Sequence, residues 1–336
     1  MPFGARVHQQ QRVAVGRHVG HGFGCDVAGG ARPDLDEELL AKLFEPALFI
    51  DGSITATRSR SSGASEVSMA RLVQSRGRAA SVAERPACDH MMPGQLRIGC
   101  AGWTIPKQDA TSFPRSGSHL DRYAQRFAAV EINSSFHRPH RRTTYERWAG
   151  AVPGGFAFSV KAPKEITHTL RLVGADAALD AFLGQATGLG SKLGPLLFQL
   201  PPSLAFDLQP VGSFFAALRR RFDGSVVCEP RHPDWFTVRA EELLMEFRIG
   251  RVAADPPVVS AAAVSGGWKG LAYFRLHGSP RVYYSEYRPD YIEWFAQRLA
   301  GLRSDRPVWC IFDNTAVGGA TRNALALQER VGRCRG

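Results

Sequence analysis

Eight apolar runs between residues 96 and 315 each end in polar or charged side chains. The clearest is VVCEPRHPDW at 226–235, whose apolar start leads into Glu229, Arg231 and His232. Such a run is typical of a buried parallel strand that presents polar groups at its C-terminal end. The eight expected strands cover residues 96–103, 129–136, 156–163, 194–202, 225–232, 249–256, 271–278 and 307–315.

Helical patterns alternate with these strands. They cover residues 120–127, 143–151, 175–187, 211–222, 240–247, 290–302 and 319–331, and only 257–270 reads as a loop connection. Most spans are therefore long enough for a right-handed crossover to a parallel neighbour. Eight such units over this length predict an α/β fold, the (β/α)8 TIM barrel, and an open doubly wound sheet is the competing fold.

Residues 1–94 differ in texture from the rest. They are rich in Gly, Arg, Ser and Ala with little sustained periodicity, and only 35–50 has an amphipathic helical pattern. We expect a largely disordered N-terminal extension at 1–94, followed by the barrel domain at 95–336. An over-extended start assignment and a genuine flexible arm both fit this composition.

Charge and composition restrict the partners. The formal net charge is +11, and nearly all of the excess falls in 95–336, which favours an anionic partner. No stretch has the length and apolarity of a membrane span, and the N-terminus lacks a signal-peptide layout, which favours the cytoplasm. The six cysteines show no close pairing, so we expect reduced and buried thiols.

Strand alternation sorts the polar side chains. In the second and third strands bulky apolar residues share one face, which suits the helix layer, so the other face should point inward. This places one set of polar residues at the mouth of the barrel, where barrel enzymes keep their sites. The catalytic candidates are Glu131, Lys161, Glu229 and His277. The candidate substrate-binding residues are Asn133, Gln199, Arg231, His232, Asp255, Arg275 and Asn314.

Residue chemistry suggests roles for this set. Arg231 and Arg275 suit a carboxylate or phosphate, whereas His277 and Glu229 are candidates for general acid–base catalysis. Lys161 could contact an anion, stabilise an electrophile or form a Schiff base if desolvated. The carboxylates and His277 could hold a divalent ion, but the neighbouring cations argue against one, so no metal or cofactor is predicted.

Two loops lie outside this set. The basic run FHRPHRR at 136–142 is typical of a solvated surface, although it could meet nucleic acid. Tyr283, Tyr284 and Tyr287 could form a lid over the mouth.

Seven segments carry a resemblance to a known family. They are GCAGW (99–103), VEINSSFHR (130–138), VKAPKEITH (160–168), LGPLLFQLPPS (193–203), EPRHPDW (229–235), YFRLHGSPRVYYSEY (273–287) and FDNTAVGGATRNA (312–324). The chain is identified by them as similar to the DUF72 (YecE-like) family. The resemblance implies a TIM barrel with a shared polar pocket over 96–331, and no reaction carries over because the family's activity is not established. The positions on these motifs are Glu131, Asn133, Lys161, Thr167, His168, Gln199, Glu229, Arg231, His232, Arg275, His277, Asn314 and Asn323.

Two positions depart from the family pattern. Ala101 stands where a serine is usual, and His137 stands where a tyrosine is often found. Any role that the family gives to the serine hydroxyl or to the tyrosine phenol at these positions cannot apply to this chain.

Three functions remain open from the sequence. The first is an enzyme acting on a small anionic or polyhydroxylated substrate, indicated by the convergent Lys, Arg, Glu and His side chains. The second is a nucleic-acid-binding or processing module, indicated by the basic excess and by 136–142. The third is a ligand sensor without turnover. Substrate, reaction and oligomeric state are left open.

Overall fold

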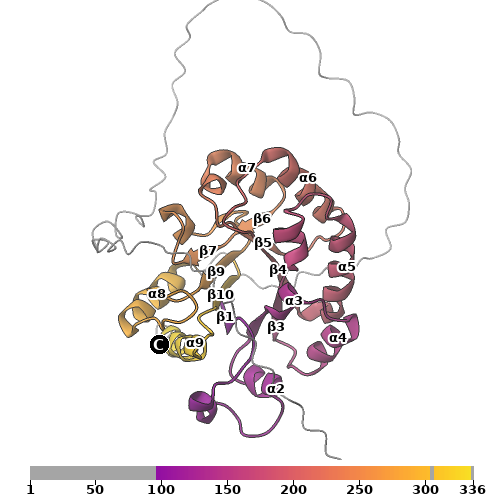
Figure 1. Cartoon of the computed structure of the whole chain (residues 1–336). Coiled ribbons are helices and arrows are strands. Elements are labelled where there is room, and N and C mark those ends of the chain that lie inside the picture. Colours follow the sequence, from indigo (N-terminus) through magenta and orange to yellow (C-terminus); the bar gives the residue numbers. More distant parts are fainter. Residues whose placement is uncertain (1–95, 303–305, 334–336) are drawn as a thin grey trace, which may run out of the picture. The chain divides into compact units, whose positions relative to one another are not determined.

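The computed structural model describes residues 96–302 and 306–333. The expected disordered extension at 1–94, with the amphipathic segment at 35–50, lies outside these residues. The described part is a mixed α/β fold on parallel strands (Figure 1). None of its helices is long and apolar enough to cross a membrane.

All eight expected strand segments are present, and the sixth is divided in two. The strands are β1 Leu96–Cys100, β2 Ala129–Ile132, β3 Ala157–Lys161, β4 Leu193–Gln199, β5 Val226–Glu229, β6 Ile249–Arg251, β7 Ala253–Asp255, β8 Gly266–Gly267, β9 Ala272–Leu276 and β10 Val308–Phe312. The two-residue strand β8 lies in the expected 257–270 loop, where a short 3-10 turn, η5 Ser260–Ala263, precedes it.

The seven expected helices are confirmed within a few residues at each end. The helices are α2 His119–Ala124, α3 Ser134–His137, α4 Arg142–Gly150, α5 Asp176–Ala186, α6 Leu208–Arg219, α7 Val238–Glu246, α8 Pro289–Leu302 and α9 Gly319–Arg333. The shorter helical turns are η1 Lys107–Ser112, η2 Glu165–Thr169, η3 Thr187–Lys192 and η4 Pro233–Phe236. Of these elements, α3 and the four short turns were not expected, because each is only about one turn long and has no clear period.

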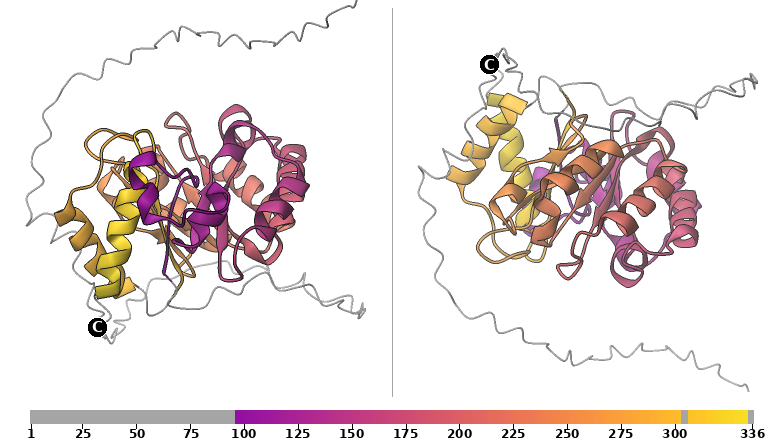
Figure 2. Two further views of the ribbon diagram at one scale, coloured as in Figure 1. Left: turned by 90° about the horizontal axis from the view of Figure 1, so that it is seen from below. Right: turned by 90° about the horizontal axis from the view of Figure 1, so that it is seen from above.

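The strands form two sheets. One has the order β1-β10-β9-β7 and the other β2-β3-β4-β5-β6-β8. Every pairing is parallel except that of β6 with β8. The crossover helices lie outside the strands, and α8 packs beside α9 (Figures 1 and 2).

The two sheets adjoin at two seams. Only Val252 separates β6 from β7, so one extended segment pairs with β5 through its first half and with β9 through its second. At the other seam a parallel bridge joins Ala101 to Glu131. There the hydroxyl of Tyr123 accepts a hydrogen bond from the N–H of Cys100 at 2.8 Å and donates one to the carbonyl of Ala129 at 3.1 Å. A side chain therefore replaces part of the backbone ladder between β1 and β2.

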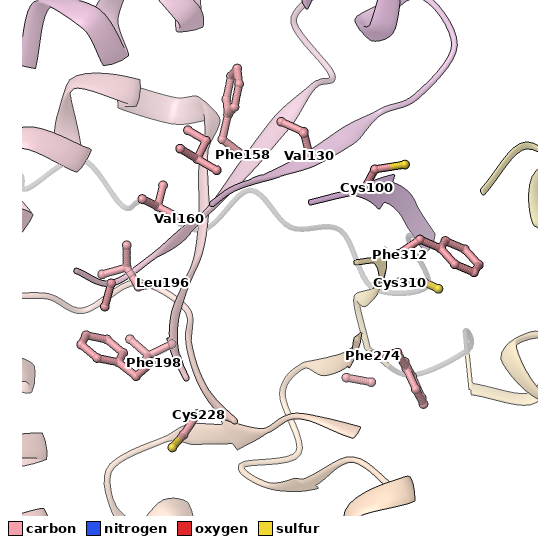
Figure 3. Packing of buried hydrophobic residues seen from close by; sticks show 14 of the residues in the cluster. Cys100, Val130, Phe158, Val160, Leu196, Phe198, Cys228, Phe274, Cys310 and Phe312 are labelled. Atoms are coloured by element: carbon pink, nitrogen blue, oxygen red, sulfur yellow. The ribbon is translucent and has the colours of Figure 1, made fainter. Parts of the chain in front are cut away.

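Two apolar clusters lie on opposite faces of the strands. The larger one packs the strands against the helices, and Figure 3 shows Phe158, Phe198 and Phe312 pointing away from the centre that the strands surround. The smaller one faces that centre and comprises Ala129, Ala157, Leu197, Val227, Val252, Leu271, Tyr273, Trp309 and Ile311. The expected alternation in the second and third strands is confirmed, because Val130 and Val160 belong to the larger cluster.

The three described cysteines are free and buried, as expected, and each lies in a strand. They are Cys100, Cys228 and Cys310. Burial raises the pKa of Cys100 to about 12. A thiol with so high a pKa is a poor nucleophile, so these cysteines act as small apolar core residues.

Candidate functional site

A buried ion cluster occupies the carboxyl ends of the strands, and Arg275 of β9 is its centre. Arg275 donates to both carboxylate oxygens of Glu131, with Nη2–Oε1 at 2.7 Å and Nε–Oε2 at 3.0 Å. Its Nη1 donates to Glu229 at 2.6 Å, and its Nη2 also donates to Asp313 at 2.9 Å. Arg275 is fully buried, and it holds the three carboxylates from three different strand ends.

His277 and Arg231 complete the cluster. The ring of His277 lies 3.0 Å from Asp313 through Nδ1 and 3.0 Å from Glu229 through Nε2. The Nη2 of Arg231 is 2.9 Å from the same Nε2, and its Nε is 2.7 Å from Glu229 Oε1. Both nitrogens of the buried imidazole are therefore engaged by other members of the cluster.

The cluster holds its carboxylates in the ionised form. Burial alone would raise the pKa of Glu229, but the charges of Arg275, Arg231 and His277 hold it well below its usual value. The pKa of Asp313 is also lowered: burial opposes the shift, and Arg275 and His277 outweigh it. Glu229 is thus held ionised at neutral pH.

Lys161, at the end of β3, differs from the other charged members. Its ammonium group lies 4.2 Å from the centre of the Phe136 ring. Among the described residues, no hydrogen bond or ion pair reaches its Nζ. Burial lowers the pKa of Lys161 to about 8, and Arg275 adds to this against the opposing effect of Glu131, Asp313 and Glu229.

Two amides border the cluster. Asn133 Nδ2 donates to Asp313 Oδ1 at 3.3 Å, and Gln199 Nε2 donates to Glu229 Oε1 at 3.3 Å. The Oδ1 of Asn133 is buried without a hydrogen-bond partner among the described residues. Eight of the eleven candidate residues therefore come together. Arg275 is at the centre, and the other seven around it are Glu131, Asn133, Lys161, Gln199, Glu229, Arg231 and His277.

Three candidate binding residues lie elsewhere. Asp255 pairs with Leu276 and so faces the helices, where its carboxylate accepts a hydrogen bond from Tyr287 at 2.8 Å. Asn314 donates to the Ser285 carbonyl and to Asn323, and fixes the loop before α8. His232 accepts from the N–H of Asp234 and caps η4. The structure therefore does not bring these three side chains into the cluster, and their hydrogen bonds serve local structure.

Arg275 is enclosed by the protein rather than open to a ligand. Its side chain has no exposed surface, and its donors bind three carboxylates of the protein itself. The same holds for Glu131, whose oxygens accept from Arg275 and from the hydroxyl of Tyr273. Among the four catalytic candidates, Lys161 alone keeps an uncommitted polar group.

Sequence reasoning missed Asp313 and Tyr273. Asp313 continues the inward series Trp309 and Ile311 in the last strand, so strict alternation would have selected it over Asn314. Tyr273 donates to Glu131 and to Ser159, both at 2.9 Å. It lies two residues before Arg275 on the same face of β9, and the same alternation would have found it.

The tyrosine loop divides into two parts. Tyr283 is 43% exposed, and its ring lies edge-on to His277 with centroids 5.8 Å apart. Tyr284 is similarly exposed and packs under the guanidinium of Arg281. Tyr287 is buried and its hydroxyl accepts from the N–H of Gly278, so a lid role for Tyr287 is wrong.

The basic run at 136–142 is partly used within the domain. Arg142 donates to Glu146 at 2.9 Å and to the hydroxyl of Thr187 at 3.0 Å. His140 lies 2.8 Å from Ser134 and packs against Trp148. Arg138, Arg141 and Arg142 are all exposed, so the arginines of the run face solvent even where Arg142 makes contacts within the domain.

No group of three or more His, Cys, Asp or Glu side chains within 96–302 and 306–333 is arranged to hold a metal ion. The carboxylates that meet at the cluster point their oxygens at guanidinium, imidazole and amide groups. A cation placed there would compete with Arg275 for the same oxygens.

Comparison with known proteins places this chain in a family. The family described as "Protein of unknown function DUF72" matches residues 97–335. The chain belongs to the DUF72 family. The match covers every member of the ion cluster, so the cluster lies wholly within the DUF72 domain.

Two curated relatives are similar in sequence to the DUF72 domain. The UPF0759 protein YecE of Escherichia coli is 29% identical over 174 residues, which are 50% of this chain and 61% of that protein. The chain thus matches less than two thirds of the length of YecE. The UPF0759 protein YunF of Bacillus subtilis is 28% identical over 268 residues, which are 70% of this chain and 94% of that protein.

Two solved structures are similar in fold. A DUF72 family protein from Enterococcus faecalis has a TM-score of 0.60 at 20% identity and covers 71% of this chain and 96% of its own. A DUF72 family protein from Thermotoga maritima has a TM-score of 0.59 at 22% identity and covers 71% of this chain and 99% of its own. The likeness shows that the described part has the fold of other DUF72 proteins.

The charges of the cluster make folding sensitive to acid. Because the pKa of Glu229 is lower in the folded chain than its usual 4.5, the stability from this carboxylate is complete above that pH and is lost as the pH falls toward the folded value. We expect the free energy of unfolding to fall from about pH 5 toward pH 3, measured by urea unfolding. Glu229→Gln should make this dependence shallower, whereas Glu246→Gln, on the exposed side of α7, should not. An unchanged pH dependence in Glu229→Gln would contradict this.

Proposed function

We propose that the DUF72 domain is a (β/α)8 barrel that binds, and acts as an enzyme on, a small anionic ligand at the carboxyl ends of its strands. The barrel is supported by the order of the pairings, which leads from β2 through β6 and β7 to β1 and back to β2 through the Ala101–Glu131 bridge. The carboxyl end of a parallel barrel is the usual place for an active site.

Lys161 is the observation that carries the ligand proposal. The three carboxylates of the cluster are balanced in formal charge by Arg275, Arg231 and Lys161, yet Lys161 pairs with none of them. A buried ammonium without a carboxylate partner costs free energy, and an anionic ligand would supply the missing partner.

Arg231 supports the same proposal. Its side chain is 15% exposed. Its Nε and Nη2 are engaged by Glu229 and His277, whereas Nη1 makes no hydrogen bond to the described residues. A guanidinium held on two sides with one amino group open is preorganised for a carboxylate or phosphate. The amides of Asn133 and Gln199 supply neighbouring groups that suit hydroxyls.

Thermal unfolding of the full chain tests this function. We expect at least one phosphorylated metabolite, carboxylate or sugar acid in a small-molecule library to raise the melting temperature, since ligand binding to the folded state contributes about 2.7 kcal/mol at 100 times Kd. Lys161→Met should abolish the shift, whereas Lys164→Met, which changes an exposed lysine in the segment after β3, should retain it. An equal shift in Lys161→Met would refute the proposal. A library without effect, together with salt-sensitive oligonucleotide binding, would favour a nucleic-acid function instead.

A further inference from the structure

The carboxylates of the cluster accept their hydrogen bonds from side chains other than Lys161. The oxygens of Glu131 accept hydrogen bonds from Arg275 and Tyr273. One oxygen of Asp313 is bound by Arg275 and His277. The other oxygen of Asp313 accepts from Asn133. Glu229 is occupied on both oxygens by the cations around it and by Gln199. Every carboxylate oxygen near Lys161 thus has another donor, and Lys161 is the basic side chain of the cluster that has no carboxylate partner among the described residues.

The surroundings of this amine increase the share of its neutral form. Phe136 covers one side of it, and the half-buried His168 lies beyond that ring, with ring centroids 5.0 Å apart. Since the pKa of Lys161 is lowered to about 8, roughly a tenth of the molecules carry the neutral amine at pH 7. An exposed lysine has far less of this nucleophilic form.

We propose that Lys161 forms a reversible imine with the carbonyl carbon of a small aldehyde or ketone that also carries a carboxylate or phosphate. This rests on the proposed ligand site and names its substrate class. The open Nη1 of Arg231 is the group that would meet the anion. The unpaired Oδ1 of Asn133 is an acceptor for the hydroxyl of the addition intermediate.

The chemistry balances without a further reagent. The lone pair of Nζ forms the C–N bond while the carbonyl π electrons move to oxygen, which takes a proton. The nitrogen gives up both of its protons, one to form that hydroxyl and the second to the hydroxyl as it departs. The carbon–oxygen bond breaks, the nitrogen lone pair forms the carbon–nitrogen double bond, and the oxygen leaves as water. Nothing is oxidised or reduced, so the step needs no cofactor.

Reductive trapping of the full chain tests the imine. The chain is incubated with pyruvate or with glyceraldehyde 3-phosphate and treated with sodium cyanoborohydride, which converts an imine into a stable secondary amine. Intact mass and peptide mapping should show one adduct, on Lys161. Uncharged propanal should label Lys161 at least about tenfold more slowly, because a single lost charged contact costs of order 1.4 kcal/mol. The two anionic probes distinguish a carboxylate from a phosphate ligand.

Three variants separate the outcomes. Lys161→Arg keeps a cation without a nucleophilic amine, so it should retain ligand-induced stabilisation and lose the adduct, whereas Lys164→Met should keep both. Labelling spread over exposed lysines, at the same rate in Lys161→Met, would overturn the imine. Stabilisation by a probe that depends on Lys161 but leaves no trapped adduct would overturn the imine and leave the ligand site standing. Probes and library that neither stabilise nor label the chain would overturn both.

The rate of trapping should also depend on pH. It should rise as the pH approaches about 8 and then level off, because the fraction of neutral amine follows the pKa of Lys161. The charges that act on this amine are those of Arg275, Glu131, Asp313 and Glu229, with His168 across the Phe136 ring. A rate that keeps rising to the pKa of an ordinary lysine would show that the labelled amine is an exposed one.

Discussion

Arg275→Met should lower the free energy of unfolding by at least about 4 kcal/mol, more than most single substitutions cost. The substitution keeps much of the side-chain volume but removes the guanidinium that binds Glu131, Glu229 and Asp313. Three carboxylates would then share a buried site with only Arg231, His277 and Lys161 near them. Breaking one buried ion pair alone costs about 3–5 kcal/mol, because the remaining charge is left without a partner.

Urea unfolding is the measurement, with Arg288→Met as the matched control. Arg288 pairs with Asp290 on the surface, where its side chain is 83% exposed, so its loss should change stability by less than about 0.5 kcal/mol. If Arg275→Met fails to fold, Glu131→Gln, which removes one charge but keeps a hydrogen-bond acceptor for Arg275, offers a milder test. A Glu131→Gln chain as stable as the unmodified one would contradict the central role of Arg275.

The second large effect is expected at Gly99 of β1. A methyl group on its Cα would collide with the backbone carbonyl of Ala129 and lie 3.1 Å from the Tyr123 hydroxyl. A backbone oxygen cannot rotate away as a side chain can, so β1 would have to move from β2. We expect Gly99→Ala to lower the free energy of unfolding by at least about 3 kcal/mol.

Gly184→Ala is the control for this effect. Gly184 lies on the exposed side of α5, and no atom outside its own helix is within 4 Å of an added Cβ. Alanine there should stabilise the chain by about 0.5–1 kcal/mol, since it is the better helix former. Equal effects of the two substitutions would mean that the approach of β1 to β2 tolerates a side chain.

Much of the fold follows from local sequence signals. Apolar runs with a polar end place the strands, and the alternation of residues in β3 separates Phe158 and Val160 from Ser159 and Lys161. The division of the sixth strand was not predictable. It depends on which neighbours the two halves of 249–255 pair with, and those partners, β5 and β9, lie far away in the sequence.

The sequence predicted most of the residues that make up the site, but not which of them bind one another. Residues that converge at strand ends could be recognised one strand at a time. The donor of each carboxylate, however, depends on contacts between residues as far as 180 positions apart. Arg275 therefore looked like a ligand contact, although it is enclosed by carboxylates. Asp255 and Asn314 were chosen because the alternation between inward and outward side chains is hard to follow at the end of a strand. A shift of one residue there turns a side chain from the centre toward the helices.

The separation between Arg275 and Lys161 has a consequence for how a family with this fold diverges. The fully buried members of the cluster maintain the protein, whereas Lys161, Gln199 and Arg231 retain some exposed surface. Substitutions among the partly exposed side chains alter what is recognised without leaving a buried charge unpaired. Proteins that descend from one ancestor can therefore change their ligands and still inherit the same buried ion cluster.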